Sequence, residues 1–103
     1  MQYDVYLNPM PTSKDIYPYV IDVQSDLLNF LPTRMAVPLK IYKSKGDAPK
    51  NLTPVFNVKG DDLLFISFLA TAIDKKNLNK RVCSLHQHAS QMVSAMDCIL
   101  SGI

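Results

Sequence analysis

Hydrophobic and polar residues alternate along much of the chain with the two-residue period of half-buried β-strands. This pattern predicts strands at residues 2–7, 17–24, 34–42, 53–58 and 63–69, with a further candidate at 78–82. The inward positions expected for the first two strands are Tyr3, Val5, Leu7, Tyr19, Ile21 and Val23. The chain up to residue 82 is therefore expected to form a sheet.

Turn-forming residues separate these runs. The cluster from Asn8 to Asp15 (NPMPTSKD) is turn material, and Lys59-Gly60-Asp61-Asp62 is the expected hairpin turn between the last two long runs. Pro38 has no N–H for a strand ladder, so it predicts an edge strand or a bulge within 34–42.

The end of the chain changes to a helical period. Ser84 and Gln87 match a capping box, in which the Ser84 hydroxyl accepts a hydrogen bond from the Gln87 amide. The stripe expected to face the core is Leu85, Ala89, Met92, Val93, Met96, Ile99 and Leu100. Gly102 stands where helices commonly close with a left-handed residue. Antiparallel strands followed by one C-terminal helix predict the α+β class, and barrel-like closure would remove exposed strand edges.

Length and composition fit one globular domain over residues 1–103. With 48% hydrophobic and 19% charged residues, the chain can build a core, whereas disordered chains are more polar and more highly charged. The start MQYDVYLNPM lacks the basic region of a signal peptide, and no apolar run approaches the roughly 18 residues of a membrane span. We expect a cytoplasmic protein without membrane association, whose Cys83 and Cys98 are free, partly buried thiols.

The net charge of +2 is too small for a typical nucleic-acid-binding domain, so no direct specific binding of nucleic acid is expected. Lysines nevertheless gather between Lys40 and Lys50, around Gly46 and Pro49. Two interpretations stay open for this segment: a solvated surface loop, or a docking site for an acidic peptide.

Residue types suited to catalysis occur in the predicted helix, but their spacing does not suit catalysis. His86 and Asp97 would lie about 16 Å apart along a helix, so they cannot form a triad with Ser90. His86 and His88 would point about 200° apart, which disfavours a zinc site with Cys83. We predict no catalytic residue, no metal and no cofactor.

Four ordered segments resemble the CcdB toxins of plasmid and chromosomal toxin–antitoxin modules. Residues 1–6 (MQYDVY) look like the start of the family, and residues 20–28 (VIDVQSDLL) are similar to its F-V-D-V-Q-S-D-I-I run. Residues 33–39 (TRMAVPL) resemble the R-R-M-V-I-P-L run, and residues 101–103 (SGI) parallel a terminal W-G-I. The resemblance spans both ends at matching spacing, while residues 40–82 match only weakly.

This resemblance implies a fold, a function and two partners. The fold is an SH3-like, CcdB-type barrel sheet with a smaller sheet and one C-terminal helix, assembled as a two-fold homodimer. The function is binding to the A subunit of DNA gyrase, which traps the cleaved gyrase–DNA complex without enzymatic catalysis. The implied gyrase contacts, carried over position by position, are Ser25, Leu27, Leu28, Asp97, Leu100, Ser101, Gly102 and Ile103. The second partner is a CcdA-type antitoxin, for which the candidate contacts are Asn8, Lys14, Lys43 and Lys45.

Two positions depart from the best-known CcdB toxins, which have Trp in place of Ser101 and Asn in place of Asp97. Trp is among the residue types most enriched at binding hot spots, so the chain lacks a large anchor there and carries an added negative charge. One alternative is therefore a family member that binds antitoxin without poisoning gyrase. Another is an endoribonuclease like the MazF/Kid toxins, which share the barrel fold. RNA cleavage would need a phosphate-binding arginine, and the only arginines are Arg34 and Arg81.

Overall fold

A computed structural model describes residues 1–42 and 52–102. Within these residues the strands are β1 (Asp4–Leu7), β2 (Tyr19–Asp22), β3 (Thr33–Ile41), β4 (Val55–Val58), β5 (Asp61–Phe65), β6 (Thr71–Asp74) and β7 (Arg81–Ser84). Short 3-10 turns form η1 (Asp26–Leu28), η2 (Ser67–Leu69), η3 (Lys75–Asn77) and η4 (His86–His88), and the chain ends in helix α1 (Ala89–Ser101).

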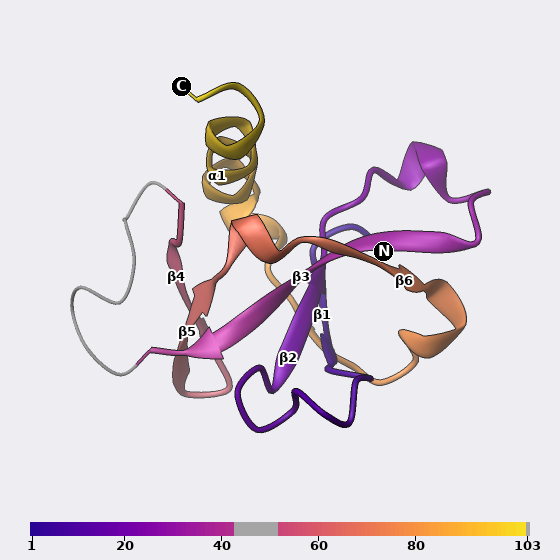
Figure 1. The fold of residues 1–103 in the computed structure, drawn as a ribbon, viewed down its shortest axis with the longest axis horizontal. Helices are drawn as coiled ribbons and strands as arrows, with labels where there is room; N and C mark the ends of the chain where they lie inside the picture. Colours follow the sequence, from indigo (N-terminus) through magenta and orange to yellow (C-terminus); the bar gives the residue numbers. More distant parts are fainter. Residues whose placement is uncertain (43–51, 103) are drawn as a thin grey trace.

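The strands form one curled antiparallel sheet that forks at β3. The main path runs β4-β5-β3-β2-β1-β7, and β6 pairs with the first half of β3 while β5 pairs with its second half. Helix α1 and the loop that carries η1 rise from the same side of this sheet, with a space between their ribbons (Figure 1). The expected α+β class, with an antiparallel barrel-like sheet and one C-terminal helix, is confirmed, and the sheet curls into a half-barrel.

Pro38 lies in the interior of the sheet, so the prediction of an edge strand is wrong. β3 pairs with β2 from Ala36 to Leu39, and Pro38 stands opposite Val20. The Pro38 carbonyl accepts a hydrogen bond from the Ile66 amide, so its backbone polar side faces away from β2. On that side the pairing with β6 ends at Ala36 and the pairing with β5 begins at Leu39. The missing N–H therefore falls at the fork, where no strand needs it.

The central strands bury side chains on both faces. One core cluster holds Tyr3, Val5, Ile21 and Val37 and packs under α1, with Tyr19 and Val23 around it. A second cluster on the opposite face consists of Tyr6, Val20, Ala36, Ile73 and Leu78. The curl of β6 and the segment after it covers this second face, which a simple in-and-out alternation does not anticipate. Leu7 is 43% exposed, contrary to expectation, because β1 ends there, beyond a register shift in its pairing with β7.

The β4–β5 hairpin is tighter than the sequence suggested. Val58 pairs directly with Asp61, which leaves only Lys59 and Gly60 in the turn. Both have positive φ, 52° and 90°, as a two-residue type I′ turn requires. Asp61 and Asp62 therefore belong to β5, where the Asp62 carboxylate accepts a hydrogen bond from the Asn57 side chain.

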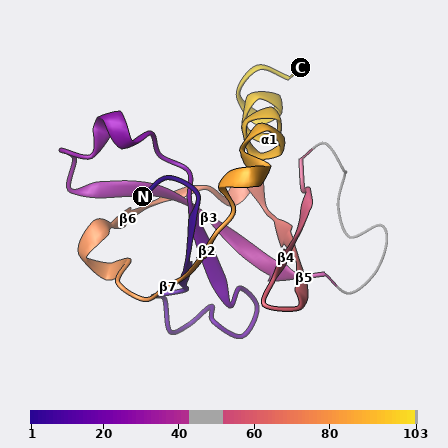
Figure 2. The same cartoon turned by 180° about the vertical axis from the view of Figure 1, so that it is seen from behind.

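The segment between β5 and α1 departs most from the prediction. The expected strand at 63–69 ends at Phe65, since η2 turns the chain so that β6 can return along β3. The strand β6 was missed, and the strand expected at 78–82 begins and ends later, as β7. β7 leads directly to the base of α1 (Figure 2).

Helix α1 begins later than the capping box predicted, and the box itself is wrong. The Ser84 hydroxyl accepts from the His86 amide rather than from Gln87, because Ser84 still belongs to β7 and a 3-10 turn precedes the helix. Met92 and Ala95 are the fully buried helix positions. Val93, Ile99 and Leu100, which were expected to face the core, are exposed. The apolar stripe is therefore wider than the surface that the sheet covers.

Candidate functional site

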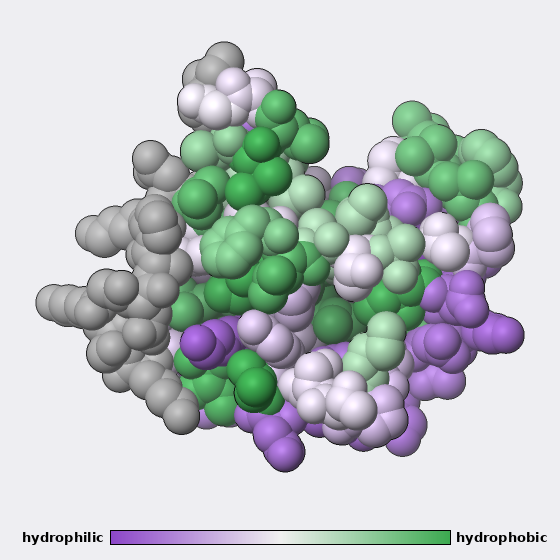
Figure 3. Space-filling view, in the orientation of Figure 1, coloured by the Kyte–Doolittle hydropathy of each residue, from purple (hydrophilic) through white to green (hydrophobic). Residues whose placement is uncertain are grey.

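An apolar groove lies between α1 and the loop after β2. It has a volume of about 420 Å³, and its lining is mostly apolar. Val23, Ser25 and Leu28 line it from the loop, Met92, Met96, Asp97 and Leu100 from the helix, and Gln2, Tyr3, Gln24, Met35 and Val93 complete it. Hydrophobic residues gather on the groove side of the helix and again on the η1 loop (Figure 3). Exposed apolar surface of this kind is typical of macromolecular contacts.

The groove brings together residues that lie far apart in the sequence. Of the gyrase contacts implied by the resemblance, Ser25, Leu28, Asp97 and Leu100 line it. Leu27 does not line the groove but projects beside it, with 89% of its surface exposed.

The remaining implied contacts belong to the helix end. Ser101 and Gly102 are exposed there, and Ile103 lies outside the described residues. Gly102 has φ 73°, a left-handed conformation, and its N–H donates to the Cys98 carbonyl over 2.9 Å. This is the C-cap that the sequence predicted. The Ser101 hydroxyl donates to the Asp97 carbonyl over 2.7 Å, so it points back along the helix.

The η1 loop places none of its apolar side chains in the core. The Ser25 hydroxyl accepts from the Leu27 amide over 3.2 Å and so caps the 3-10 turn. None of the three residues of η1 is buried, and Leu27, Leu28 and the nearby Phe30 are exposed. Something other than the core must therefore hold this loop in place.

Arg34 supplies that support. Its side chain rises from β3 into the base of the loop and the residue is only 3% exposed. Its Nε donates to Asp22 Oδ2 over 2.8 Å, and its Nη2 donates to the Gln24 carbonyl over 2.8 Å and to Asp26 Oδ1 over 3.1 Å. Burial disfavours the charged form, but the hydrogen bonds and charges of Asp22 and Asp26 outweigh it and raise the pKa of Arg34. Arg34 therefore remains a fixed cation.

Sequence reasoning missed this structural role of Arg34, which it considered only as a possible RNA contact. The signal that was present is the acidic residue on each side of Gln24, at Asp22 and Asp26, with an arginine at the start of the next strand. The second arginine, Arg81, also has a carboxylate partner, since its Nε lies 3.2 Å from Asp4 Oδ2.

Tyr6 lies on the face of the sheet opposite α1, close to the same charged groups. Its burial, together with the negative charges of Asp4 and Asp22, raises the pKa of Tyr6 above its ordinary value. Its hydroxyl oxygen accepts a hydrogen bond from the backbone nitrogen of Met1 over 3.3 Å. The phenol therefore stays protonated well into the alkaline range.

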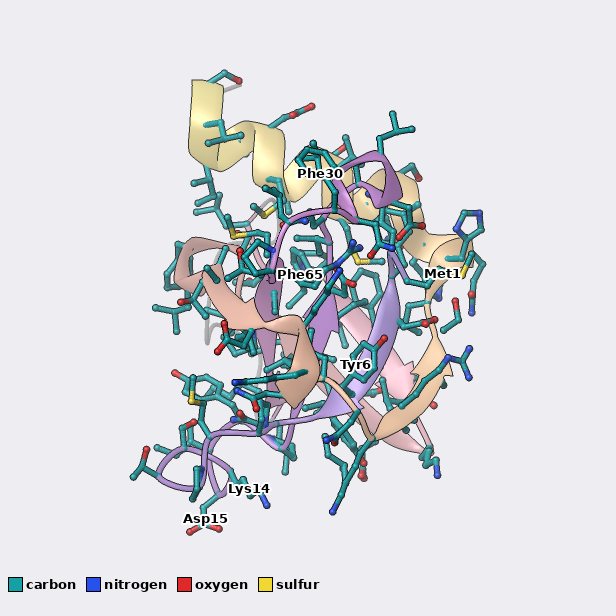
Figure 4. All side chains as sticks on the ribbon, turned by 90° about the vertical axis from the view of Figure 1, so that its right-hand side faces the viewer. Met1, Tyr6, Lys14, Asp15, Phe30 and Phe65 are labelled. Atoms are coloured by element: carbon teal, nitrogen blue, oxygen red, sulfur yellow. The ribbon has the colours of Figure 1, made fainter. Side chains whose placement is uncertain are left out.

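A second, polar pocket lies near the Asn8–Asp15 turn, at the other end of the molecule. It has a volume of about 330 Å³ and is lined by Leu7, Asn8, Pro9, Lys14, Asn77, Asn79 and Lys80. Lys14 and Asp15 lie at the end opposite to Phe30 and α1 (Figure 4). Two of the predicted antitoxin contacts, Asn8 and Lys14, thus share one pocket, while Lys43 and Lys45 lie outside the described residues.

Asn8 contributes to this pocket mainly as an organiser of the turn. It is 3% exposed, and its Nδ2 donates to Ser13 Oγ and to the Tyr17 carbonyl. Its Oδ1 accepts from the Met10 amide. The exposed lysines are therefore the groups through which the pocket can attract a ligand.

Cysteine and histidine residues sit in separate packing environments. Cys83 and Cys98 are free thiols of intermediate burial, as expected, and burial raises the pKa of the Cys83 thiol. The His88 ring stacks on Phe56 with ring centroids 5.0 Å apart, while His86 is exposed. Residues 1–42 and 52–102 hold no cluster of three metal-binding side chains. No helix in that part of the chain has the length and apolar character needed to cross a bilayer.

The fold and the groove define a small α+β half-barrel protein with an apolar contact surface between its helix and a loop. A model of the CcdB protein family matches residues 2–102 of the 103-residue chain. The chain therefore belongs to the CcdB family, whose members are toxins of toxin–antitoxin modules that act on DNA gyrase by protein binding. No significant match to a curated protein sequence was found.

Proposed function

We propose that this protein is the toxin of a type II toxin–antitoxin module. It binds the A subunit of DNA gyrase and traps the cleaved gyrase–DNA complex, and a CcdA-type antitoxin neutralises it. It acts in the cytoplasm as a homodimer, and it acts by binding rather than by catalysis.

The observation that carries this proposal is the composition of the groove. The η1 loop and the end of α1 supply its two walls, and both segments correspond to gyrase contacts implied by the family resemblance. Leu27 and Leu100 hold 89% and 79% of their surface in solvent, which is costly for large apolar side chains unless a partner covers them. Two exposed leucines flanking one apolar groove are suitable anchors for a protein partner.

The anchors differ in kind from the Trp of the best-known CcdB toxins. The Ser101 hydroxyl is bonded to the helix backbone, so Leu100 is the large apolar group at the described helix end. Asp97 adds a carboxylate to the helix wall of the groove. A basic residue on the partner would complement this charge, and such complementarity affects the association rate and the choice of partner.

A homodimer agrees with the exposed part of the apolar stripe. Ile99 on α1 is 39% exposed, lies outside the groove, and is beyond the surface that the sheet covers. An isologous interface would bury such residues twice, once on each protomer. A symmetric dimer would then present both helix ends to a symmetric target.

The antitoxin contact is proposed for the polar pocket. Lys14 and Lys80 give it two cations, and Asn77 and Asn79 add amide groups that can bond to a carboxylate or to a peptide backbone. An acidic, extended antitoxin segment has the matching chemistry. The predicted contacts Lys43 and Lys45 stay part of this proposal.

Both arginines argue against RNA cleavage as the function. Arg34 is buried and bonded to Asp22, and Arg81 is paired with Asp4. The RNA cleavage considered from the sequence would need an arginine free to meet the phosphate, and the buried Arg34 is not free, so protein binding fits the described residues better.

The test mixes the purified chain with gyrase and supercoiled plasmid and measures linear DNA held covalently by gyrase. We expect trapping by the intact chain, and at least roughly tenfold more protein to be needed after Leu27→Ala or Leu100→Ala. Ile16→Ala is the matched control, because Ile16 is 54% exposed but follows the Asn8–Asp15 turn. A chain without Ile103 tests the terminus. No trapping by the intact chain, with antitoxin binding retained, would instead select a family member that does not poison gyrase.

A further inference from the structure

We propose that Arg34 is a positioning residue for the gyrase contact, a proposal that rests on the function proposed above. It touches no residue of the partner. Its role is to hold the loop from Ser25 to Asn29 in the conformation in which Leu27 and Leu28 meet the partner.

The Arg34 guanidinium forms hydrogen bonds with residues at both ends of the loop. On the near side it bonds the Asp22 carboxylate and the Gln24 carbonyl, and on the far side its Nη1 donates to Asn29 Oδ1 over 3.3 Å. The Asp26 carboxylate accepts from it in between. A guanidinium carries five N–H donors in a fixed plane, so a single side chain can fix four points of one loop relative to each other.

Neighbouring polar groups reinforce the same conformation. The Gln24 amide donates to Asp22 Oδ1, and the Gln24 side chain donates to the carbonyls of Leu28 and Thr33. Lys75 Nζ reaches across from η3 to the Asn29 carbonyl over 2.6 Å. The bond between Gln24 and Leu28 lies within the loop, and the others tie the loop to the end of β2, to the start of β3 and to η3.

Apolar packing restrains the loop only through Leu28, which is 42% exposed at the edge of the groove. No residue of η1 is buried, and segments with few buried contacts open at low free-energy cost. Without the guanidinium the loop would sample many conformations, and only the fraction resembling the bound one would bind. The apparent dissociation constant rises in inverse proportion to that fraction.

The test uses a pair of variants that leave Arg34 and Asp22 in place, because removal of either would leave a buried charge and endanger the fold. Asp26→Ala with Asn29→Ala removes two acceptors from the exposed side of the guanidinium, and with Asp26 also the acceptor of the Gln2 amide. Asn29→Ala alone removes only a bond from Arg34 and should loosen the loop to a smaller extent. Asp26→Asn with Asn29→Asp exchanges the two side chains and keeps an oxygen acceptor at each position as well as the net charge. Asp15→Ala removes an exposed carboxylate from the opposite end and is the control.

Two measurements separate the positioning role from the proposed function. In the free protein, 15N relaxation should show the amides of Leu27, Leu28 and Asn29 falling from an order parameter near 0.85 to below about 0.6 in the double-alanine variant. The exchanged variant and the Asp15 control should stay rigid. Binding to the isolated gyrase A subunit should weaken roughly tenfold in the double-alanine variant and recover in the exchanged one.

The outcomes are distinct. A rigid loop in the double-alanine variant overturns the positioning role, and so does a mobile loop with unchanged gyrase binding. Equal loss of binding in the alanine and exchanged variants would mean that Asp26 contacts gyrase itself, which also overturns it. If the intact chain does not bind the gyrase A subunit, the proposed function fails, and the relaxation data still decide whether Arg34 positions the loop.

Discussion

The two walls of the groove are held by opposite kinds of interaction. Helix α1 is fixed by apolar packing, with Met92 and Ala95 buried against the sheet and Leu85 buried before the helix begins. The η1 loop buries none of its three residues and is fixed by hydrogen bonds that converge on Arg34. Apolar burial is non-directional, whereas hydrogen bonds to a planar guanidinium fix orientation.

This difference explains how apolar contact residues can stand in solvent on both walls. If Leu27 and Leu28 helped to hold their own loop, they would be buried and could not meet a partner. Because polar groups hold the loop from below, its leucines are left on the outside. The helix achieves the same result differently, since its apolar stripe is wider than the sheet and Leu100 projects beyond it.

The largest expected effect on stability is at the groove wall that Arg34 holds by hydrogen bonds. Arg34→Ala should lower the free energy of unfolding by about 4 kcal/mol, because it leaves the buried Asp22 carboxylate without its main partner. Urea denaturation measures this. Arg81→Ala is the comparison variant, because Arg81 keeps 55% of its side chain exposed and its buried partner Asp4 retains the N-terminal amino group at 3.6 Å. Its loss should be smaller, about 1 kcal/mol. Equal losses in the two variants would contradict the special role of the buried arginine.

On the apolar side, Met92→Ala should lower the free energy of unfolding by about 3 kcal/mol, through lost burial and the cavity that remains. The η1 loop should keep its order parameters in this variant, because the hydrogen bonds of Arg34 remain. Ser94→Ala, at an exposed position of the same helix outside the groove, is the control and should stay within about 0.5 kcal/mol of the unchanged protein. If the order parameters of the η1 loop fell together with the stability of the helix, the two walls would not be held independently, which would contradict the account.

Smaller effects are expected at the two caps. Gly102→Ala should destabilise the last turn of α1 by about 1 kcal/mol, because φ is 73° there and a Cβ would be strained although it would meet no neighbouring atom. Ser25→Ala should cost about 0.5 kcal/mol at η1 by removing the acceptor for the Leu27 amide. Amide exchange in the last turn of α1 and at Leu27 measures each effect locally. Changes that spread to the other wall would show that the walls are coupled.

The smallest effect is a pH dependence of stability. Burial and nearby carboxylates raise the pKa of Tyr6, so the folded state holds this proton more tightly than the unfolded state does. The contribution is fully present below pH 10, the ordinary pKa of tyrosine, and is lost as the pH rises through the raised value. Tyr6→Phe should therefore lose less stability than the unchanged protein above pH 10. If the free energy of unfolding fell equally with pH in the two proteins, the raised pKa of Tyr6 would be contradicted.

The parts of the fold that follow from local pattern were predictable. The alternation at Val5 and Ile21 and the stripe through Met92 predicted elements and core positions that the structure confirms. The fork at β3 was not predictable, because the position of Pro38 depends on β5 and β6 meeting β3 from elsewhere in the chain. The prediction of a capping box was wrong for a similar reason, because Ser84 pairs in the sheet as the last residue of β7.

The candidate site divides in the same way. Its residues came from the family resemblance, and no local pattern indicated that Leu28 and Leu100 line one groove. The role of Arg34 was missed because its four bonding partners lie on a strand end and a loop whose conformation the arginine itself helps to set. Sequence patterns report periodic burial well, but they do not report polar networks that become visible only when the chain is folded.

The central claim is that the η1 loop and the end of α1 form one contact surface for gyrase. The most direct test is amide hydrogen exchange of the chain, free and bound to the gyrase A subunit. We predict simultaneous protection of residues 25–29 and 97–102, with little change in the turn from Asn8 to Asp15. Protection confined to that turn, or to only one wall of the groove, would contradict the account.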